Sequence, residues 1–135
     1  MAQPHIRKFD DVEPVARGGG IETRPLTGKE TGAQGISTGV TSFPPGAAVE
    51  LHTHNVEEAV TLLEGEARVE IEGREPVSLR PYDTTYVPAG VAHRFVNAGT
   101  GRMRILWCYG GTEVTRTFLA SGETVGHLSP GDRIG

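Results

Sequence analysis

The sequence is poor in three features, each of which would point to a particular class of protein. A single cysteine, Cys108, cannot form an internal disulfide, which is typical of proteins from a reducing compartment. No apolar run approaches the ~20 residues that a membrane-spanning helix needs. The first residues, MAQPHIRKFDD, also have no apolar core of the kind that a signal peptide requires. The sequence therefore predicts a cytoplasmic protein that does not enter a membrane.

Positive charge is scarce as well. The formal net charge is −4 and the isoelectric point is near 5.7, with arginines scattered along the chain and no cluster of lysines. A nucleic-acid-binding surface needs a basic face, so the composition predicts no nucleic-acid partner.

Glycine and proline, in contrast, are abundant. The 19 glycines and 9 prolines make up about a fifth of the 135 residues, against a usual share of ~12%. They form no repeat and no Gly/Ser tract, and they recur as turn signals through the middle of the chain. No stretch shows a sustained helical period. This pattern predicts one all-β domain built from short strands, a barrel or a sandwich.

Alternating apolar and polar residues show which strands are buried. Ala67, Val69 and Ile71 are expected to face inward, and the segment 103–109 reads as a strand covered on both faces. We expect residues 1–20 to form an irregular arm that ends in a flexible glycine joint, residues 21–119 to form the barrel, and residues 120–135 to form a polar tail.

Three histidines and a glutamate form a candidate metal site. His52 and His54 are one residue apart on a predicted strand, so both side chains point to the same face. Glu58 begins the next apolar alternation, and His93 follows a turn downstream. Burying these four polar groups without a partner would be costly, whereas one divalent cation satisfies all of them.

These residues also carry a family resemblance. The spacing of Gly46, His52, His54, Glu58 and Gly65 is similar to the first motif of the cupin superfamily, and the second motif is matched by Pro88, Gly90, His93 and Asn97. The chain departs from the second motif at Tyr82, where the family usually has glycine. The resemblance covers residues 46–97 and implies a double-stranded β-helix, or jelly roll, with a metal ion inside the barrel.

The ligand set suits several metals and leaves coordination positions open for a small-molecule substrate. Three histidines and a carboxylate accept Fe(II), Mn(II), Ni(II), Co(II) or Zn(II). Glu58, Tyr86 and Tyr109 are the candidate catalytic residues. Arg24, Arg116 and His127 are expected to be solvated.

The resemblance leaves the reaction open. It implies a metal-dependent enzyme acting on a small polar or anionic substrate, with a dioxygenase-type oxidoreductase favoured and an isomerase, lyase or decarboxylase as the alternative. Val60 occupies the position at which cupin lyases of sulfonium compounds carry a tyrosine, which counts against them. A non-catalytic small-molecule-binding cupin is the other alternative.

Assembly is expected from the sheet edges. The N-terminal segment and residues 112–119 are predicted edge strands, and uncovered edges invite pairing. Because small cupins usually pair through such strands, the resemblance implies a homodimer.

Overall fold

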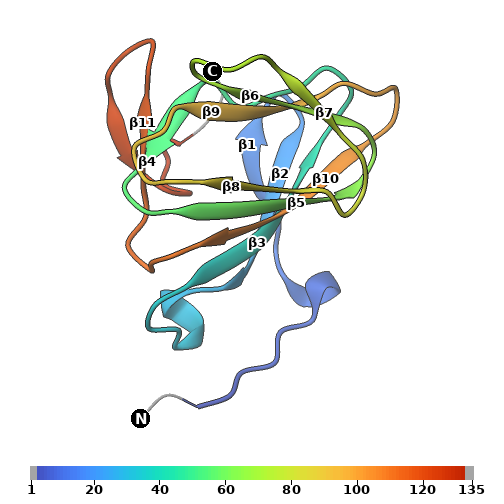
Figure 1. Cartoon of the computed structure of the whole chain (residues 1–135). Helices are drawn as coiled ribbons and strands as arrows, with labels where there is room; N and C mark the ends of the chain where they lie inside the picture. The colour runs from blue at the N-terminus through green and yellow to red at the C-terminus, as the bar shows by residue number, and fades with distance from the viewer. Residues whose placement is uncertain (1–2, 133–135) are drawn as a thin grey trace.

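A computed structural model describes residues 3–132 of the chain. In these residues the chain folds into two six-stranded antiparallel sheets that face each other, with the strand orders β1-β2-β3-β10-β5-β8 and β12-β11-β4-β9-β6-β7 (Figure 1). The all-β jelly roll predicted from the sequence is confirmed. The strands are β1 (Val15–Gly18), β2 (Ile21–Thr27), β3 (Ser37–Phe43), β4 (His52–His54), β5 (Glu58–Glu64), β6 (Ala67–Ile71), β7 (Val77–Leu79), β8 (Thr84–Val87), β9 (His93–Asn97), β10 (Met103–Tyr109), β11 (Thr115–Phe118) and β12 (Thr124–Gly126).

The alternation of side chains along β10 explains why this strand lies at the centre of its sheet. Met103, Ile105, Trp107 and Tyr109 are buried between the two sheets, while the residues between them are half-buried, so the outer face of this strand is less covered than the sequence predicted. The strand pairs with β3 on one side and with β5 on the other. Gly39 of β3 lies against the Trp107 indole, and an added Cβ would stand 2.2 Å from the ring. Only glycine therefore allows the indole to lie flat on β3.

The N-terminal segment is more ordered than the sequence indicated. A 3-10 turn (η1, Phe9–Asp11) is followed by β1, which pairs with β2 in a hairpin. Gly18, Gly19 and Gly20 all have positive φ and form the turn of this hairpin. The expectation of an irregular arm with a flexible glycine joint is therefore wrong for residues 15–20, because glycines at positive φ specify a tight turn.

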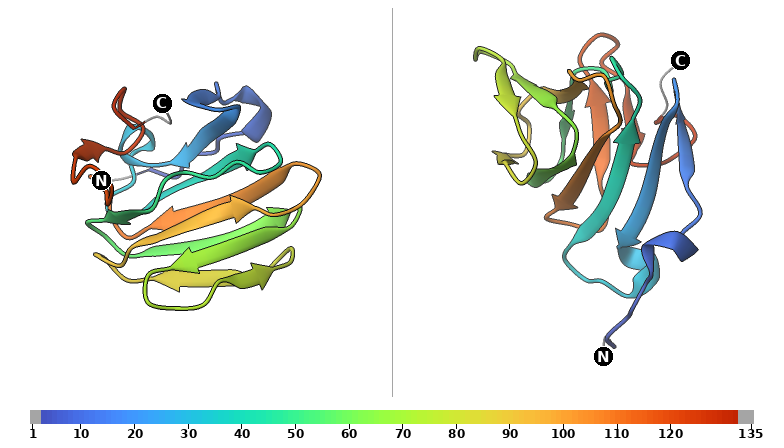
Figure 2. Two further views of the ribbon diagram at one scale, coloured as in Figure 1. Left: turned by 90° about the horizontal axis from the view of Figure 1, so that it is seen from above. Right: turned by 90° about the vertical axis from the view of Figure 1, so that its right-hand side faces the viewer.

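The C-terminal segment also joins a sheet. β12 pairs with β11, which pairs in turn with β4. Residues 112–119 were expected to form an edge, but β12 occupies the edge instead. The right-hand view of Figure 2 shows the C-terminal segment beside the β1–β2 hairpin. The β1–β2 hairpin and the C-terminal segment thus lie on the same side of the barrel.

Among residues 3–132, the helical segments are the short 3-10 turns η1 and η2 (Lys29–Thr31). No helix within that range is long and apolar enough to cross a membrane.

Candidate metal centre

Three short strands bring the histidines together. His52 and His54 lie on the same face of β4, and His52 pairs directly with His93 of the neighbouring antiparallel strand β9. Glu58 opens β5 in the opposite sheet and faces them across the barrel. All four side chains are buried. The structure therefore places at one point the four residues that the sequence singled out as metal ligands.

The three imidazoles are close enough to share one ion. Their candidate ligand nitrogens all lie within 4.8 Å of one another, and their ring centroids are 4.6 to 5.5 Å apart. Three buried histidines at these separations could hold a metal ion.

Backbone hydrogen bonds fix which nitrogen of each ring is free. A carbonyl oxygen only accepts hydrogen bonds, so each Nδ1 that contacts one must carry the proton. The Nε2 of His52 and of His54 then keeps its lone pair, whereas the Nε2 of His93 shares a proton with Glu58 until a cation takes its place. The pairs are His52 with Glu50 O at 2.6 Å, His54 with Thr115 O at 3.0 Å and His93 with Val91 O at 2.9 Å. Such backbone contacts are the usual way in which proteins orient histidine ligands.

Two of the histidines are held neutral. Burial lowers the pKa of His52 and of His54, and the positive charge of Arg116 lowers both further. Glu58 partly opposes this effect at His54, whose pKa still falls to about 4. Neutral imidazoles can bind a metal ion without first losing a proton.

Glu58 supplies the negative charge of the cluster. Its Oε1 lies 2.8 Å from His93 Nε2 and 3.9 Å from His54 Nε2. Burial raises the pKa of the Glu58 carboxyl, but the His93 hydrogen bond and the charges around it outweigh burial and lower the pKa overall. An ionised carboxylate facing imidazole lone pairs needs a proton or a cation between them, so this donor set fits a divalent metal.

The same cavity contains aromatic side chains and a fourth histidine. The Tyr109 hydroxyl lies 3.3 Å from His54 Nε2, and burial raises the pKa of this phenol well above 10. The half-buried His127 ring packs against Trp107 and Tyr109, with ring centroids 4.9 Å from each. Burial lowers the pKa of His127 well below 6.5. The expectation that His127 is exposed is therefore wrong, because the C-terminal segment folds back onto the barrel.

Tyr86 does not reach the cavity. It is 62% exposed, and its hydroxyl donates a 2.8 Å hydrogen bond to Glu57 on the outer surface. The reason is register: Tyr86 pairs with Ala59, the neighbour of Glu58, and so faces outward. Of the three candidate catalytic residues, Glu58 and Tyr109 line the cavity and Tyr86 lies outside it.

Sequence reasoning missed two buried arginines. Arg17 of β1 and Arg116 of β11 are 3% and 4% exposed and line the same cavity. Arg116 was expected to be solvated. Arg24, in contrast, keeps partial exposure and stacks its guanidinium on Phe9. The sequence did contain a signal for the burial of Arg116. It lies two residues from the apolar Val114 and two from Phe118, so its side chain shares their inward face.

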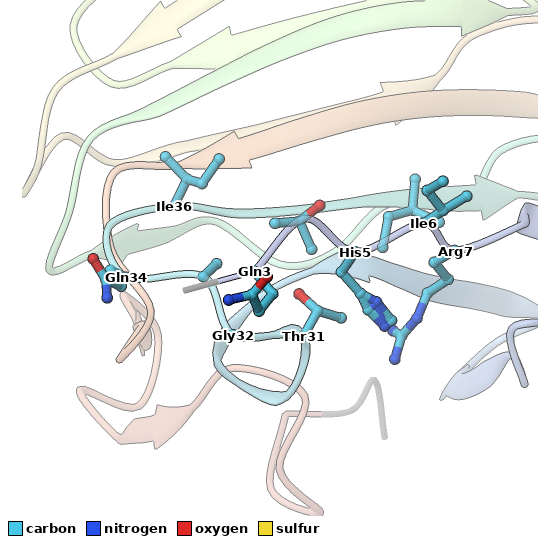
Figure 3. A pocket seen from close by; sticks show the side chains of 11 residues that line it. Gln3, His5, Ile6, Arg7, Thr31, Gly32, Gln34 and Ile36 are labelled. Carbon is cyan, nitrogen blue, oxygen red and sulfur yellow. The ribbon is translucent and has the colours of Figure 1, made fainter. Parts of the chain in front are cut away.

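A second hollow lies at the N-terminal end of the described chain. Figure 3 shows side chains of the segment 3–7 beside the loop 31–36, with His5 and Arg7 near each other. Arg7 donates a hydrogen bond to the Pro25 carbonyl. None of the described residues that line this hollow is acidic, so it contains no carboxylate to complete a metal site or an acid–base pair.

Comparisons with known proteins agree with this architecture. The family model described as "Cupin domain" matches residues 39–109. "Protein SchB" of Streptomyces halstedii is 34% identical over 109 residues, covering 80% of this chain and 78% of its own. "Polyketide synthase CurC" of Streptomyces cyaneus is 29% identical over 106 residues, covering 78% of this chain and 68% of its own.

Solved structures show the same fold at lower identity. The polyketide cyclase RemF of Streptomyces resistomycificus is 20% identical, with a TM-score of 0.72 over 89% of each chain. An RmlC-like cupin of Shewanella frigidimarina is 21% identical, with a TM-score of 0.70 over 81% of this chain and 92% of its own. At these identities the likeness concerns the fold.

Proposed function

The chain belongs to the cupin domain family, and from this premise we propose that it is a metal-dependent enzyme that cyclises a poly-β-carbonyl (polyketide) chain without net oxidation. The observation that carries the proposal is the buried cluster of three imidazoles facing a carboxylate, with a protonated phenol beside it. The substrate class comes from the relatives, two of which are named as a polyketide synthase and a polyketide cyclase.

We assign one divalent ion to His52, His54, Glu58 and His93. When bound, such an ion polarises a carbonyl oxygen and so acidifies the neighbouring C–H bonds. The three Nδ1–H···O=C hydrogen bonds hold the rings so that their Nε2 lone pairs converge. The buried walls of the cavity exclude water, which strengthens each electrostatic contact made there.

The remaining chemistry needs a proton acceptor and a proton donor. In an aldol-type ring closure, a methylene between two carbonyls loses a proton, its carbon bonds to a distant carbonyl carbon, and the carbonyl oxygen takes up a proton. His127, held neutral, is the acceptor that faces the cavity without belonging to the ligand set. Tyr109, held protonated, is the donor. Loss of water from the product then gives the aromatic ring.

The test combines metal content with product analysis. Untagged protein, purified without chelators, should contain about one divalent ion per chain by elemental mass spectrometry. Added to a minimal polyketide synthase that releases unfolded chains, it should shift the products toward one cyclised compound. Tyr109→Phe should slow this shift while the metal stays bound. Metal-loaded protein that leaves the product mixture unchanged would contradict the proposal.

A dioxygenase is the second candidate, and one observation favours it. Two of the histidines, on the neighbouring strands β4 and β9, and Glu58 of the opposite sheet supply the two-histidine, one-carboxylate combination that non-haem Fe(II) oxygenases use. Oxygen-electrode measurements after Fe(II) reconstitution separate the two reactions. Substrate-dependent oxygen uptake supports the dioxygenase, whereas ring closure under nitrogen supports the cyclase. Metal-free protein that binds the substrate without turnover would indicate a binding module.

We also propose that the chain forms a homodimer through the edge strand β1, whose outer edge is unpaired within residues 3–132. Light scattering that gives the monomer mass would contradict this. The cytoplasmic location stays a prediction.

A further inference from the structure

Two arginines are buried inside the barrel. Arg17 and Arg116 come from strands far apart in the sequence, and both line the cavity that contains His52, Glu58 and His93. Arg116 is the direct strand partner of His54. Directly opposed residues of antiparallel strands have Cβ atoms ~5 Å apart, so the Arg116 side chain begins beside the histidine cluster.

A buried aspartate holds the two guanidinium groups. Asp132 Oδ2 lies 3.0 Å from an Arg17 amino nitrogen, and its Oδ1 accepts a 2.9 Å hydrogen bond from Arg116. Arg17 further donates to the Asp132 carbonyl and to Thr23 Oγ1. Arg17 is thus tied on three sides and serves to position its neighbour.

Arg116 is different, because part of its guanidinium is unused. Its Nε is buried and has no hydrogen-bond partner among residues 3–132. It is the only buried side-chain nitrogen or oxygen atom in this range without a partner. A buried donor without a partner is costly, and proteins rarely keep one without a use for it. The Arg116 side chain lines the cavity that contains His52, Glu58 and His93, and its Nε is enclosed by the surrounding protein.

The charges of the cavity also favour the binding of an anion. Two buried arginines, both paired with Asp132, and the carboxylate of Glu58 belong to the same buried region, so the positive and negative fixed charges balance. Any divalent ion held by the histidines therefore leaves an excess of two positive charges in a buried space. Such an excess is stabilised by an anionic ligand, so a bound divalent ion should strengthen the anion binding that Arg116 alone provides in the metal-free protein.

We propose that Arg116, positioned by Arg17 and Asp132, is a binding site for an oxyanion of the substrate, either a carboxylate or the enolate of a 1,3-dicarbonyl. The choice of these two ligands rests on the function proposed above. The site itself rests on the unused, buried guanidinium N–H. Arginine suits both ligands because its planar fork donates parallel hydrogen bonds to two oxygens.

Anion binding to the metal-free protein tests this site without turnover. After chelator treatment and dialysis into low-chloride buffer, the protein is titrated with malonate and with the neutral malonamide. Calorimetry measures the affinity, and the fluorescence of Trp107, the single tryptophan and a residue of the cavity wall, reports the location. Malonate should bind and quench Trp107, and malonamide should bind far more weakly. Acetylacetone titrated above and below its own pKa distinguishes the enolate from the carboxylate.

Two variants and one control decide the result. Arg116→Met should weaken malonate binding by ~10- to 100-fold, the range of a charge-assisted hydrogen bond. Arg116→Lys keeps the charge opposite Asp132 but lacks Nε, so it should fold and should still bind malonate several-fold more weakly. Arg102→Met, at an exposed arginine paired with Glu64, should change nothing.

The outcomes separate this site from the cyclase. Malonate binding that is equal in the wild type and in Arg116→Lys, or no malonate binding by the wild type, overturns the site even if cyclisation is found. Binding that depends on Arg116, in a protein that cyclises nothing, supports the site and rejects the cyclase.

Discussion

The two ends of the barrel interior are built from the same strands but carry different side chains. Along β5 the inward residues change from Glu58 to Val60 and Leu62, and along the antiparallel β10 they change from Tyr109 to Ile105 and Met103. We call the part around Glu58 the polar end and the part around Leu62 the apolar end. Both are almost completely buried.

The difference shows which interactions stabilise the fold and which stabilise the site. The apolar end is stabilised by removing hydrocarbon from water, which needs no partner. The polar end contains ionisable groups whose burial is tolerable only through mutual contacts, backbone hydrogen bonds or a bound ion. We therefore expect substitutions at the polar end to change binding, and substitutions at the apolar end to change stability.

The largest expected effect is on metal binding at the polar end. His93→Ala removes one Nε2 and leaves Glu58 without its 2.8 Å partner. Because changing even a hydrogen-bond partner of a ligand costs 10- to 100-fold in metal affinity, we expect a loss above ~100-fold on removing the ligand itself. Competition with a chelator measures this loss, and circular dichroism should show the barrel intact. His5→Ala, at an exposed histidine outside the cluster, is the control. Full metal content in His93→Ala would contradict the assigned site.

The matching change at the apolar end is Leu62→Ala. Leu62 is 1% exposed and belongs to the apolar core, so truncation leaves a cavity and should cost about 2–5 kcal/mol of unfolding free energy. Urea unfolding of the metal-free protein measures it. Metal stoichiometry in the folded variant should stay that of the wild type. Loss of the metal from folded Leu62→Ala would show that the two ends are coupled.

The sequence predicted the two ends unequally. Alternation identified the apolar end, since Val60 and Leu62 on one strand, and Met103 and Ile105 on another, recur with a period of two residues. At the polar end, motif spacing led to the histidines and Glu58, which the fold places together. Whether they bind the metal stays a prediction.

The register in which the strands pair could not be predicted from the sequence. Tyr86 faces outward because it pairs with Ala59, a contact between residues far apart in the chain. Arg17 was missed for a related reason, since its burial depends on Asp132, which lies 115 residues away. Neither contact can be predicted from the residues that neighbour it in the sequence.

The pH dependence of stability probes the polar end in the metal-free protein. The pKa of His54 is about 4 in the folded chain, against 6.5 for a free histidine. At pH values between 4 and 6.5, His54 is protonated in the unfolded chain and neutral in the folded chain. The free energy of unfolding therefore falls as the pH drops from 6.5 to 4. This single group accounts for about 3 kcal/mol over that range.

Urea midpoints measured between pH 7 and pH 4 test this dependence. His54→Asn should make the curve shallower, with His52 and His127 still contributing to the slope, whereas His5→Ala should leave the slope unchanged. A wild-type curve as flat as that of His54→Asn would show that burial does not hold His54 neutral.

The smallest expected effect concerns a turn attached to the apolar end. Tyr82 has a φ of +76°, and its backbone N–H donates a 2.6 Å hydrogen bond to the carbonyl of Leu62. Its side chain is 81% exposed, so little packing compensates for the left-handed backbone. Tyr82→Gly should therefore raise the unfolding free energy by ~1 kcal/mol, the cost that a Cβ adds at such a position. Tyr82→Ala, which keeps the Cβ, should bring no such gain. Because the turn is hydrogen-bonded to Leu62 at the apolar end, metal affinity should not change. A gain in stability accompanied by altered metal binding would show that the two ends are not independent.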